Sequence, residues 1–278
     1  MRTSRPLRLV LLGVVGLIAV VLLFPIYWMV MTSVVPTRQL LTGSPALLPL
    51  GDGVGLEAYG DVLAARPVLR WLSNSAFVTV WSAVIASVVS TLAGYSLSRF
   101  RTRGQQAMGF TLLFSRMLPG TLLIVPVYAL VSSLGRIDDL WSLVFVNVVA
   151  IVPFTTWMMK GFVDGIPPEL EESARVDGCS SLGALWRIVL PLMRPGLAAT
   201  VTYSAVLAWS DFLFARTLMT TPDGWTVTVG IASFIGQYDV DWAGLMATGL
   251  LSMLPLVVVF ALLEPFLVRG MTAGSVKG

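Results

Sequence analysis

Long apolar runs alternate with short polar segments along the chain. The runs at 9–31, 71–98, 140–159 and 242–263 contain no charged residue. Because a helix of about 20 apolar residues is long enough to cross the hydrocarbon core of a membrane, each run is predicted to form a membrane-spanning helix.

Two further apolar runs are less regular. The run at 108–133 is interrupted by Arg116, Pro119, Gly120 and Pro126. Its helix is predicted to be kinked or locally unwound, which is tolerated where protein or a cavity surrounds the break. The run at 196–218 carries Asp211. The pattern therefore predicts an all-α integral membrane protein with six spans, whose two termini lie on the same side.

Composition supports this class of protein and argues against catalysis. Of the 278 residues, 56% are hydrophobic and 12% are charged, which is too apolar for a soluble domain of this size. One cysteine and no histidine exclude an internal disulfide and the usual zinc and nucleophile sites. No P-loop is present, since neither Lys160 nor Lys277 follows a glycine. Any energy from ATP must come from a partner chain, and no metal site is expected.

Lysine and arginine fall mainly on one side of the predicted spans. That side carries Arg2, Arg5, Arg8, Arg99, Arg101, Arg103, Lys160, Arg175, Arg187, Arg194, Arg269 and Lys277. The other side carries Arg38, Arg66, Arg70, Arg136 and Arg216. Because positively charged loops stay in the cytoplasm, both termini are predicted to be cytoplasmic. The basic residues are better explained by membrane topology than by nucleic acid, which we do not expect as a partner.

The segment 167–195 is polar and patterned within this apolar sequence. Pro167 and Pro168 followed by acidic residues predict the start of a helix, and Gly178 predicts its end. One face of this helix is expected to hold Leu170, Ser173, Ala174 and Asp177.

A second short helix is expected after this glycine bend. Ser180 or Ser181 can cap it, and Pro191 is expected to interrupt it. Its common face is predicted to hold Leu182, Leu185, Trp186 and Val189.

These residues carry a resemblance to a known family. Glu172-Ser173-Ala174, Asp177-Gly178 and Ile188-Val189-Leu190-Pro191 resemble the EAA loop of permease subunits from binding-protein-dependent ABC importers. The resemblance implies a coupling helix that docks on a cytoplasmic ATPase. Ser173 and Cys179 depart from the usual alanines, and the change in size is small. The residues expected to couple to the ATPase are Glu171, Glu172, Ser173, Ala174, Asp177, Gly178, Leu182, Ile188, Leu190 and Pro191.

Other segments resemble the carbohydrate importers among these permeases. They are 71–75, Leu118-Pro119-Gly120, Pro153-Phe154, 208–213 and the tail 269–278, which is similar to the end of the shorter, six-helix subunit of maltose-type systems. The resemblance implies a type I (MetI-like) importer fold in the cytoplasmic membrane. It also implies four kinds of partner: a second permease, two ATPase subunits that hold ATP and Mg, an extracytoplasmic sugar-binding protein and a sugar. No cofactor is expected on this chain.

The expected divisions follow from these assignments. They are a tail and first span at 1–31, an extracytoplasmic loop of irregular chain or short helices at 32–70, a transmembrane core at 71–268 with the coupling loop at 164–195, and a tail at 269–278.

Four polar or aromatic residues within the spans are candidates for the translocation path. Arg116 can contact a solute or pair with a carboxylate such as Asp211, and Asn147 can join two helices or contact the solute. Trp209 and Asp211 can belong to an outer gate or meet the binding protein, whereas Trp209 can also be an aromatic residue at the membrane interface.

Two alternatives to a sugar importer subunit remain open at this stage. One is a stand-alone six-span secondary transporter or channel, although such proteins usually bury coupling carboxylates or repeat their halves. The other is an ABC permease for a solute that is not a sugar. The sequence does not say which sugar would be carried.

Overall fold

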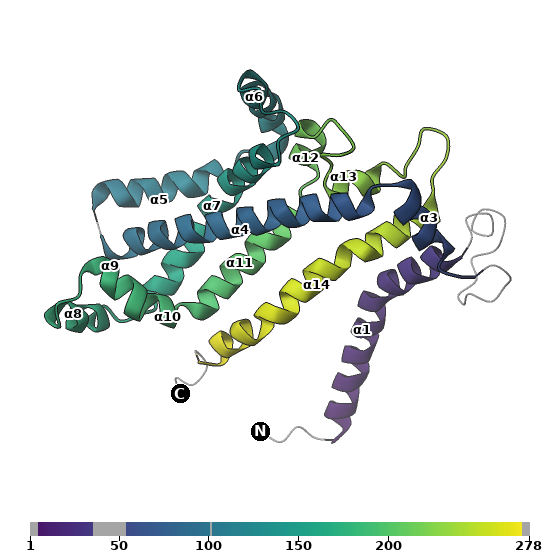
Figure 1. Cartoon of the computed structure of the whole chain (residues 1–278). Helices are drawn as coiled ribbons and strands as arrows, with labels where there is room; N and C mark the ends of the chain where they lie inside the picture. The colour runs from purple at the N-terminus through teal and green to yellow at the C-terminus, as the bar shows by residue number, and fades with distance from the viewer. Residues whose placement is uncertain (1–4, 36–53, 101, 274–278) are drawn as a thin grey trace. The chain divides into compact units, whose positions relative to one another are not determined.

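The computed structural model describes residues 5–35, 54–100 and 102–273, and within these ranges every regular element is helical (Figure 1). The elements are α1 (Arg5–Val34), α3 (Glu57–Ala65), α4 (Val68–Arg99), α5 (Arg103–Ser115), α6 (Gly120–Ser133), α7 (Leu140–Asp164), α8 (Glu169–Val176), α9 (Ser181–Ala184), the π-helical turn η1 (Leu185–Val189), α10 (Leu190–Leu192), α11 (Arg194–Trp209), α12 (Leu213–Leu218), α13 (Val227–Ala232) and α14 (Trp242–Ala273). Residues 36–53 of the predicted loop and 274–278 of the predicted tail lie outside the described residues.

Four described helices, α1, α4, α7 and α14, are long and apolar enough to cross a membrane. They correspond to the four uncharged runs, so that prediction is confirmed. α3 is a short helix in the segment where irregular chain or short helices were expected.

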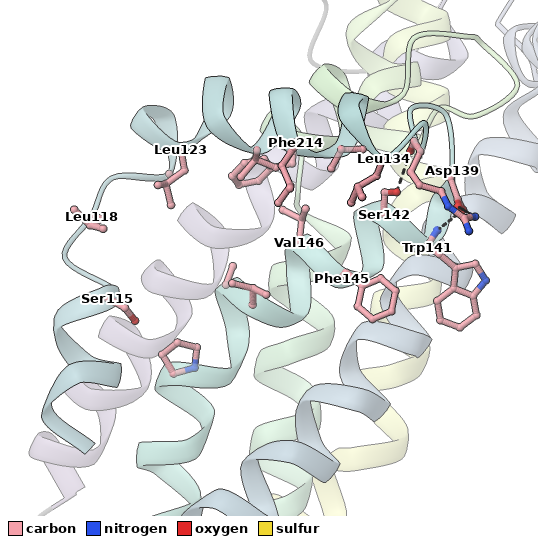
Figure 2. Close-up of a pocket in the computed structure, with 18 of the residues that line it drawn as sticks. Ser115, Leu118, Leu123, Leu134, Asp139, Trp141, Ser142, Phe145, Val146 and Phe214 are labelled. Carbon is pink, nitrogen blue, oxygen red and sulfur yellow. Dashed lines mark hydrogen bonds and ion pairs between the residues drawn. The ribbon is translucent and has the colours of Figure 1, made fainter. Parts of the chain in front are cut away.

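The third predicted span is sharply broken. α5 and α6 are bent by 95° relative to each other at the four residues that separate them, which confirms the predicted kink. Pro119 precedes the first residue of α6 with an extended backbone, where the missing proline N–H costs no hydrogen bond. The bend leaves a cavity of about 840 Å³ between α6 and α7 (Figure 2).

The fifth predicted span is shorter than expected. α11 has 16 residues and ends at Trp209, so the prediction that this span reaches Leu218 is wrong. The Oδ1 atom of Asp211 accepts a hydrogen bond from the backbone N–H of Phe214 and so stabilises the start of a separate helix, α12. The described residues therefore hold four long spans and one bent pair, and the count of six stays a prediction.

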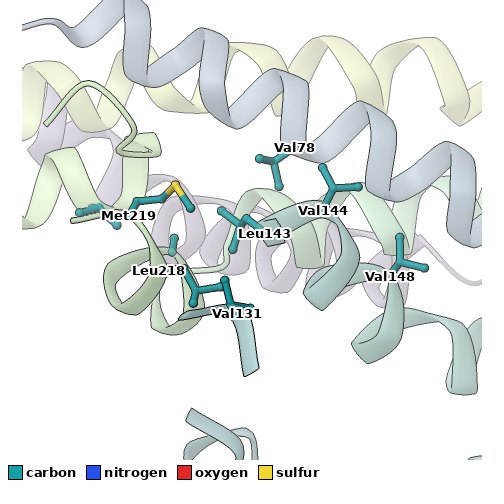
Figure 3. Close-up of a cluster of buried hydrophobic side chains, with 9 residues drawn as sticks. Val78, Val131, Leu143, Val144, Val148, Leu218 and Met219 are labelled. Carbon is teal, nitrogen blue, oxygen red and sulfur yellow. The ribbon is translucent and has the colours of Figure 1, made fainter. Parts of the chain in front are cut away.

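The chain divides into two compact units, and the larger one contains residues 70–229 and 254–278. Within it, α7 packs against α11 and α5. A cluster of Val78, Leu143, Val144, Leu218 and Met219 forms its largest described core, with side chains from α4, α7 and the segment around α12 (Figure 3).

The helices α4, α7 and α11 of the larger unit have two distinct ends. At the first, Ser98 of α4 bonds Asp164 of α7 beside the α8–α10 segment. At the second, Asn74 donates to the carbonyl oxygens of Asp223 and Trp225, which follow α12. We call these the α8 end and the α12 end.

The smaller unit contains residues 1–69 and 230–253. The hydroxyls of Ser33 and Tyr59 lie 2.9 Å apart and join α1 to α3. Arg66 donates to the hydroxyl of Ser233, and its guanidinium lies 4.6 Å from the centre of the Phe234 ring. These contacts hold the two sequence segments of this unit together.

Candidate functional site

The helix α8 begins and ends where the sequence predicts. Pro168 immediately precedes it, and Glu169, Glu171 and Glu172 lie in its first turn, where carboxylates interact favourably with the helix dipole. Gly178 has φ 88°. The N–H of Cys179 donates to the carbonyl of Ala174 at 2.9 Å, and that of Gly178 donates to Arg175 at 3.1 Å. This is a Schellman ending, so the predicted glycine bend is confirmed.

The second short helix begins at the predicted cap but does not stop at Pro191. The Ser180 hydroxyl accepts a hydrogen bond from the N–H of Gly183 at 3.1 Å. The helix then widens into η1, where the N–H of Leu190 donates to the carbonyl of Leu185, and it continues through Pro191 to Leu192. The expected interruption is wrong. We infer that the wide turn accommodates the proline ring, which in a regular α-helix would clash with the carbonyl four residues earlier.

The two faces of α8 differ from the predicted ones. Glu171 and Ala174 point inward and are buried. Leu170, Glu172, Ser173 and Asp177 are exposed, and Val176 is 88% exposed. The expected common face of Leu170, Ser173, Ala174 and Asp177 is therefore wrong at Ala174, because helix packing here is decided by Glu171.

The predicted face of the second helix is also divided. Leu185 and Val189 are buried in a cluster with Met159 and Met193, whereas Leu182 and Trp186 are 62% and 63% exposed. The prediction of one shared face is wrong because the π-helical turn changes the register after Ala184. Ile188 and Leu190 are half-buried, and Pro191 is exposed.

Glu171 is held by side chains of α4. Its Oε1 atom accepts from Nε of Arg99 at 2.5 Å, and its Oε2 atom accepts from the hydroxyl of Tyr95 at 2.7 Å. The Glu171 side chain is only 4% exposed. Its carboxylate therefore faces the chain itself and does not belong to the exposed surface of α8, which is where the sequence placed it together with Glu172.

Sequence reasoning missed three residues of this site. The sequence assigns Arg99 only a topological role and assigns no role to Tyr95, because their contact with Glu171 is between residues more than 70 positions apart. Val176 carries a local signal that was available, since it is a large apolar residue in a polar helix and its position is not on the predicted buried face.

Asn147 and Asp211 contact each other rather than a free space. Nδ2 of Asn147 donates to the Leu143 carbonyl at 3.0 Å and to Oδ2 of Asp211 at 3.3 Å. The backbone carbonyl of Asp211 accepts from the hydroxyl of Thr228 at 2.7 Å. Of the two roles considered for Asn147, the geometry agrees with a hydrogen bond between α7 and the chain after α11.

Arg116 lies at the break between α5 and α6 and lines the cavity there. Its Nη1 donates to the Ala150 carbonyl at 2.9 Å, and its Nη2 donates to the hydroxyl of Tyr203 at 2.7 Å. The suggested pairing with Asp211 is therefore not the observed one. Arg116 ties the broken span to α7 and α11 while its guanidinium stays exposed to the cavity.

The rest of the cavity is mostly apolar, with a polar margin at one end. In Figure 2, Leu123 of α6 and Leu134, the residue that follows α6, lie opposite Phe145 and Val146 of α7. The pair Arg136 and Asp139, 3.0 Å apart, lies beside Trp141 at the α12 end.

Trp209 is 6% exposed among the described residues. An aromatic residue of the membrane interface would expose its ring to lipid. The interpretation of Trp209 as an interfacial residue is therefore wrong, since its ring belongs to the packed interior.

The α12 end is closed by Asp138, which has φ 61°. Its carboxylate accepts from the hydroxyl and the N–H of Thr220, at 2.5 and 2.6 Å, and from the N–H of Thr221 at 3.1 Å. Burial by itself raises the pKa of Asp138, but these hydrogen bonds outweigh it and hold the pKa below the usual 3.8. The carboxylate thus fastens the α6–α7 loop to the chain after α12.

Comparison with known proteins identifies the family. The model of the family "Binding-protein-dependent transport system inner membrane component" matches residues 86–273. The chain belongs to this family. It is therefore an inner-membrane permease component of a transport system that depends on a binding protein, and the predicted transport role, rather than an enzymatic one, is confirmed.

Several relatives, including the following two, match the permease over nearly its whole length. The inner membrane ABC transporter permease protein YcjP of Escherichia coli (strain K12) is 34% identical over 95% of this chain and 94% of its own. The diacetylchitobiose uptake system permease protein DasC of Streptomyces coelicolor is 30% identical, with 92% of each chain covered.

A solved structure shows the fold. The permease superposes on a chain of a bacterial ABC transporter involved in the import of the acidic polysaccharide alginate, with a TM-score of 0.80 and 23% identity over 95% of this chain and 99% of the other. This confirms the predicted all-α ABC importer permease fold. A stand-alone secondary transporter or channel is excluded by the family.

Proposed function

We propose that this permease carries a sugar, as a mono-, di- or oligosaccharide or a derivative, across the cytoplasmic membrane in an ATP-driven importer. The carbohydrate-type sequence segments and the diacetylchitobiose relative support this cargo. Cargo choice among sugars would depend on the binding protein, so the chain by itself supports the class of solute and no single member of it.

The outer face of α8 is proposed to dock on an ATPase. The single observation that carries this proposal is the exposure of several apolar side chains in the α8–α10 segment: Val176 is 88% exposed, and Leu170, Leu182 and Trp186 are exposed as well. A group of exposed apolar side chains in a segment that is predicted to be cytoplasmic is typical of an interaction surface. Glu172 lies on the same exposed side and would pair with a basic group of the ATPase.

The partners are proposed from the resemblance to carbohydrate importers. A second permease would complete the membrane part, two ATPase subunits would bind ATP and Mg, and an extracytoplasmic protein would deliver the sugar. The α8 end and both termini would be cytoplasmic, in agreement with the distribution of lysine and arginine. No step requires a cofactor on this chain.

Transport would proceed by alternating access. Closure of the ATPase subunits on ATP would displace α8, and the helices behind it would move as rigid bodies to open the path on the other side of the membrane. The cavity between α6 and α7 is proposed as part of that path, with Arg116 as a hydrogen-bond donor to the solute. The guanidinium has five N–H donors, so its two described bonds leave capacity for this.

The docking proposal is tested by retention of the ATPase. The complete transporter is purified through a tag on this permease, with Val176→Asp or Glu172→Ala in place of the native residue, and the amount of ATPase that remains bound is measured. We expect Val176→Asp to reduce it by about tenfold or more, since a charge would be buried in the interface. Tyr238→Asp is the matched control, because Tyr238 is 93% exposed in the loop between α13 and α14. Full ATPase retention in both docking variants would refute the assignment of α8.

The cargo proposal is tested separately. ATP-dependent uptake is measured in vesicles that contain the complete importer, over a panel of mono-, di- and oligosaccharides, amino acids and peptides. The native binding protein is also purified with its bound solute. Identification of an amino acid or peptide in that protein would disprove the sugar class without affecting the family.

A further inference from the structure

The helix α8 has little apolar surface with which to hold its place. It contains eight residues, and a helix of this length is not stable in water by itself. Its buried side chains are Glu171 and Ala174, one of which is charged. Burial of apolar side chains therefore does not account for the position of α8. We infer that the polar contacts of Glu171 hold the helix in place.

Those contacts connect three separate segments. Arg99, the last residue of α4, donates through Nε to Glu171 at 2.5 Å and through Nη2 to the Ile166 carbonyl at 3.0 Å. Ile166 lies in the turn between α7 and α8. The planar guanidinium can hold two acceptors in a fixed geometry, which the point charge of a lysine cannot do. Tyr95, one turn earlier on α4, occupies the second oxygen of Glu171.

We propose that Arg99, Glu171 and Tyr95 form a rigid joint, through which a displacement of α8 is passed to α4 and α7 together. This inference rests on the proposed docking of α8 on an ATPase and assigns the residues that transmit the movement. They are positioning residues, since they touch neither ATP nor solute. The α8 joint, as we call these three residues, lies between the exposed face of α8 and the long spans.

The neighbouring contacts explain why α4 and α7 would move together. Gly94 of α4 lies so close to α7 that a Cβ atom built on it would be 2.8 Å from the backbone N of Lys160. One turn later the hydroxyl of Ser98 donates to Asp164 of α7 at 2.6 Å. The backbones of the two helices are therefore in close contact beside the joint. A displacement of α8 that acts on Glu171 would move both helices.

The test compares transport with ATP hydrolysis in the intact importer. The complete transporter is reconstituted in proteoliposomes, and the amount of solute imported per ATP hydrolysed is measured, together with ATPase retention. The principal variant is Arg99→Met with Glu171→Met, which removes both charges and so leaves no unpaired charge buried. We expect the ATPase to stay bound and hydrolysis to continue, while the import per ATP falls by on the order of fivefold or more.

Two milder variants are expected to lower the import per ATP by smaller amounts, and one control variant should leave it unchanged. Arg99→Lys keeps the charge but loses the two-acceptor geometry, so its import per ATP should lie between native and double variant. Tyr95→Phe removes one hydrogen bond to Glu171 and should lower the ratio less. The control Arg70→Gln breaks an exposed ion pair with Asp223 at the α12 end, away from the joint, and should leave the ratio at the native value.

Each outcome decides between the joint and the docking proposal. A native import-to-ATP ratio in the double variant would overturn the joint. Loss of the ATPase from the double variant would also overturn it, because the three residues would then only maintain the docking surface. If the double variant does not insert, Arg99→Lys decides by the same ratio. Full ATPase retention and native uptake in Val176→Asp would instead refute docking by α8, whatever the joint variants do.

Discussion

A carboxylate holds a loop or a short helix in place at each end of the larger unit, and the two carboxylates have different partners. At the α8 end, Glu171 is buried and bonds the side chains of Arg99 and Tyr95. At the α12 end, Asp138 is half-buried and bonds the hydroxyl of Thr220 and two backbone N–H groups. The first carboxylate joins helices through an ion pair, whereas the second holds a loop through its backbone.

The helices α6 and α8 end in the same way. α6 ends with Gly135 at φ 66°, and the N–H of Arg136 donates to the Val131 carbonyl, as Cys179 does to Ala174 at the end of α8. The two ends therefore share their local backbone chemistry and differ in the tertiary contacts that follow it. The comparison indicates that local turns position both loops, and that the buried ion pair makes one of them able to carry a load.

The largest expected difference between the two ends is the loss in free energy of unfolding when the arginine of an ion pair is removed. Arg99→Met leaves Glu171 buried without its positive partner and should lower the free energy of unfolding by about 3–5 kcal/mol. Arg136→Met, at the α12 end, removes a pair whose arginine side chain is 67% exposed, and should cost about 0–1 kcal/mol. Unfolding of both variants in detergent micelles measures the difference, and equal costs would contradict the distinction between the ends.

The next largest effect concerns the backbone contact between α4 and α7. Gly94→Ala puts a Cβ atom 2.8 Å from Lys160 N and Met159 Cβ, so the helices have to separate. Such overpacking should destabilise the permease by about 1–3 kcal/mol.

The control for this contact is Gly161→Ala, where no described atom lies within 4 Å of the added Cβ. It should stabilise α7 by about 0.5–1 kcal/mol, because alanine favours helices more than glycine does. Thermal unfolding of both variants decides, and a stable Gly94→Ala would show that the α8 end is loosely packed.

The two glycine endings allow a comparison in which stability and function separate. Gly178→Ala and Gly135→Ala both force a Cβ into the left-handed region, with open space around it, and each should cost about 1–2 kcal/mol. Gly178→Ala should in addition lower solute import per ATP, because the turn at Gly178 lies beside the docking face of α8. Gly135→Ala should leave solute import per ATP unchanged.

Asparagine at either position provides the matched control, since it tolerates positive φ better than alanine. Restored stability and import per ATP in Gly178→Asn would assign the loss to backbone strain. Equal losses of import in Gly135→Ala and Gly178→Ala would contradict a special role of the α8 end.

The smallest expected effect is the pH dependence of the α12 end. Because the pKa of Asp138 is lowered in the folded state, its stabilising contribution is complete above the unfolded value near 3.8 and is lost as the pH falls through the folded pKa. Asp138→Asn, which keeps the positive φ, should cost about 1 kcal/mol at pH 6.

The measurement is the difference in thermal midpoint between native protein and Asp138→Asn. This difference should be constant between pH 5 and pH 7 and should shrink below the usual pKa of an aspartate. A difference that grows on acidification would contradict the hydrogen-bonding pattern of Asp138.

The sequence by itself determined the four long helices, the break in the third span and the end of α8. Uncharged apolar runs predicted the four long helices, since only a helix satisfies its backbone in lipid. Pro119 and Gly120 predicted the break in the third span, and Gly178 predicted the end of α8. These signals are local, because they act through the φ angle or the hydrogen bonds of the residues next to them.

Tertiary structure alone decided which side chains of these elements meet. The sequence assigns Glu171 to the docking surface. In the structure its side chain points inward, where it bonds Arg99, a residue 72 positions away. Arg116 likewise donates a hydrogen bond to Tyr203, which lies 87 positions away in the sequence. The faces of the second short helix were missed for another reason, since a π-helical turn shifts the register and periodicity assumes a regular helix. Local pattern predicted the break at Pro119 and the glycine ending of α8, whereas the partner of a buried polar group depends on the packing of the whole bundle.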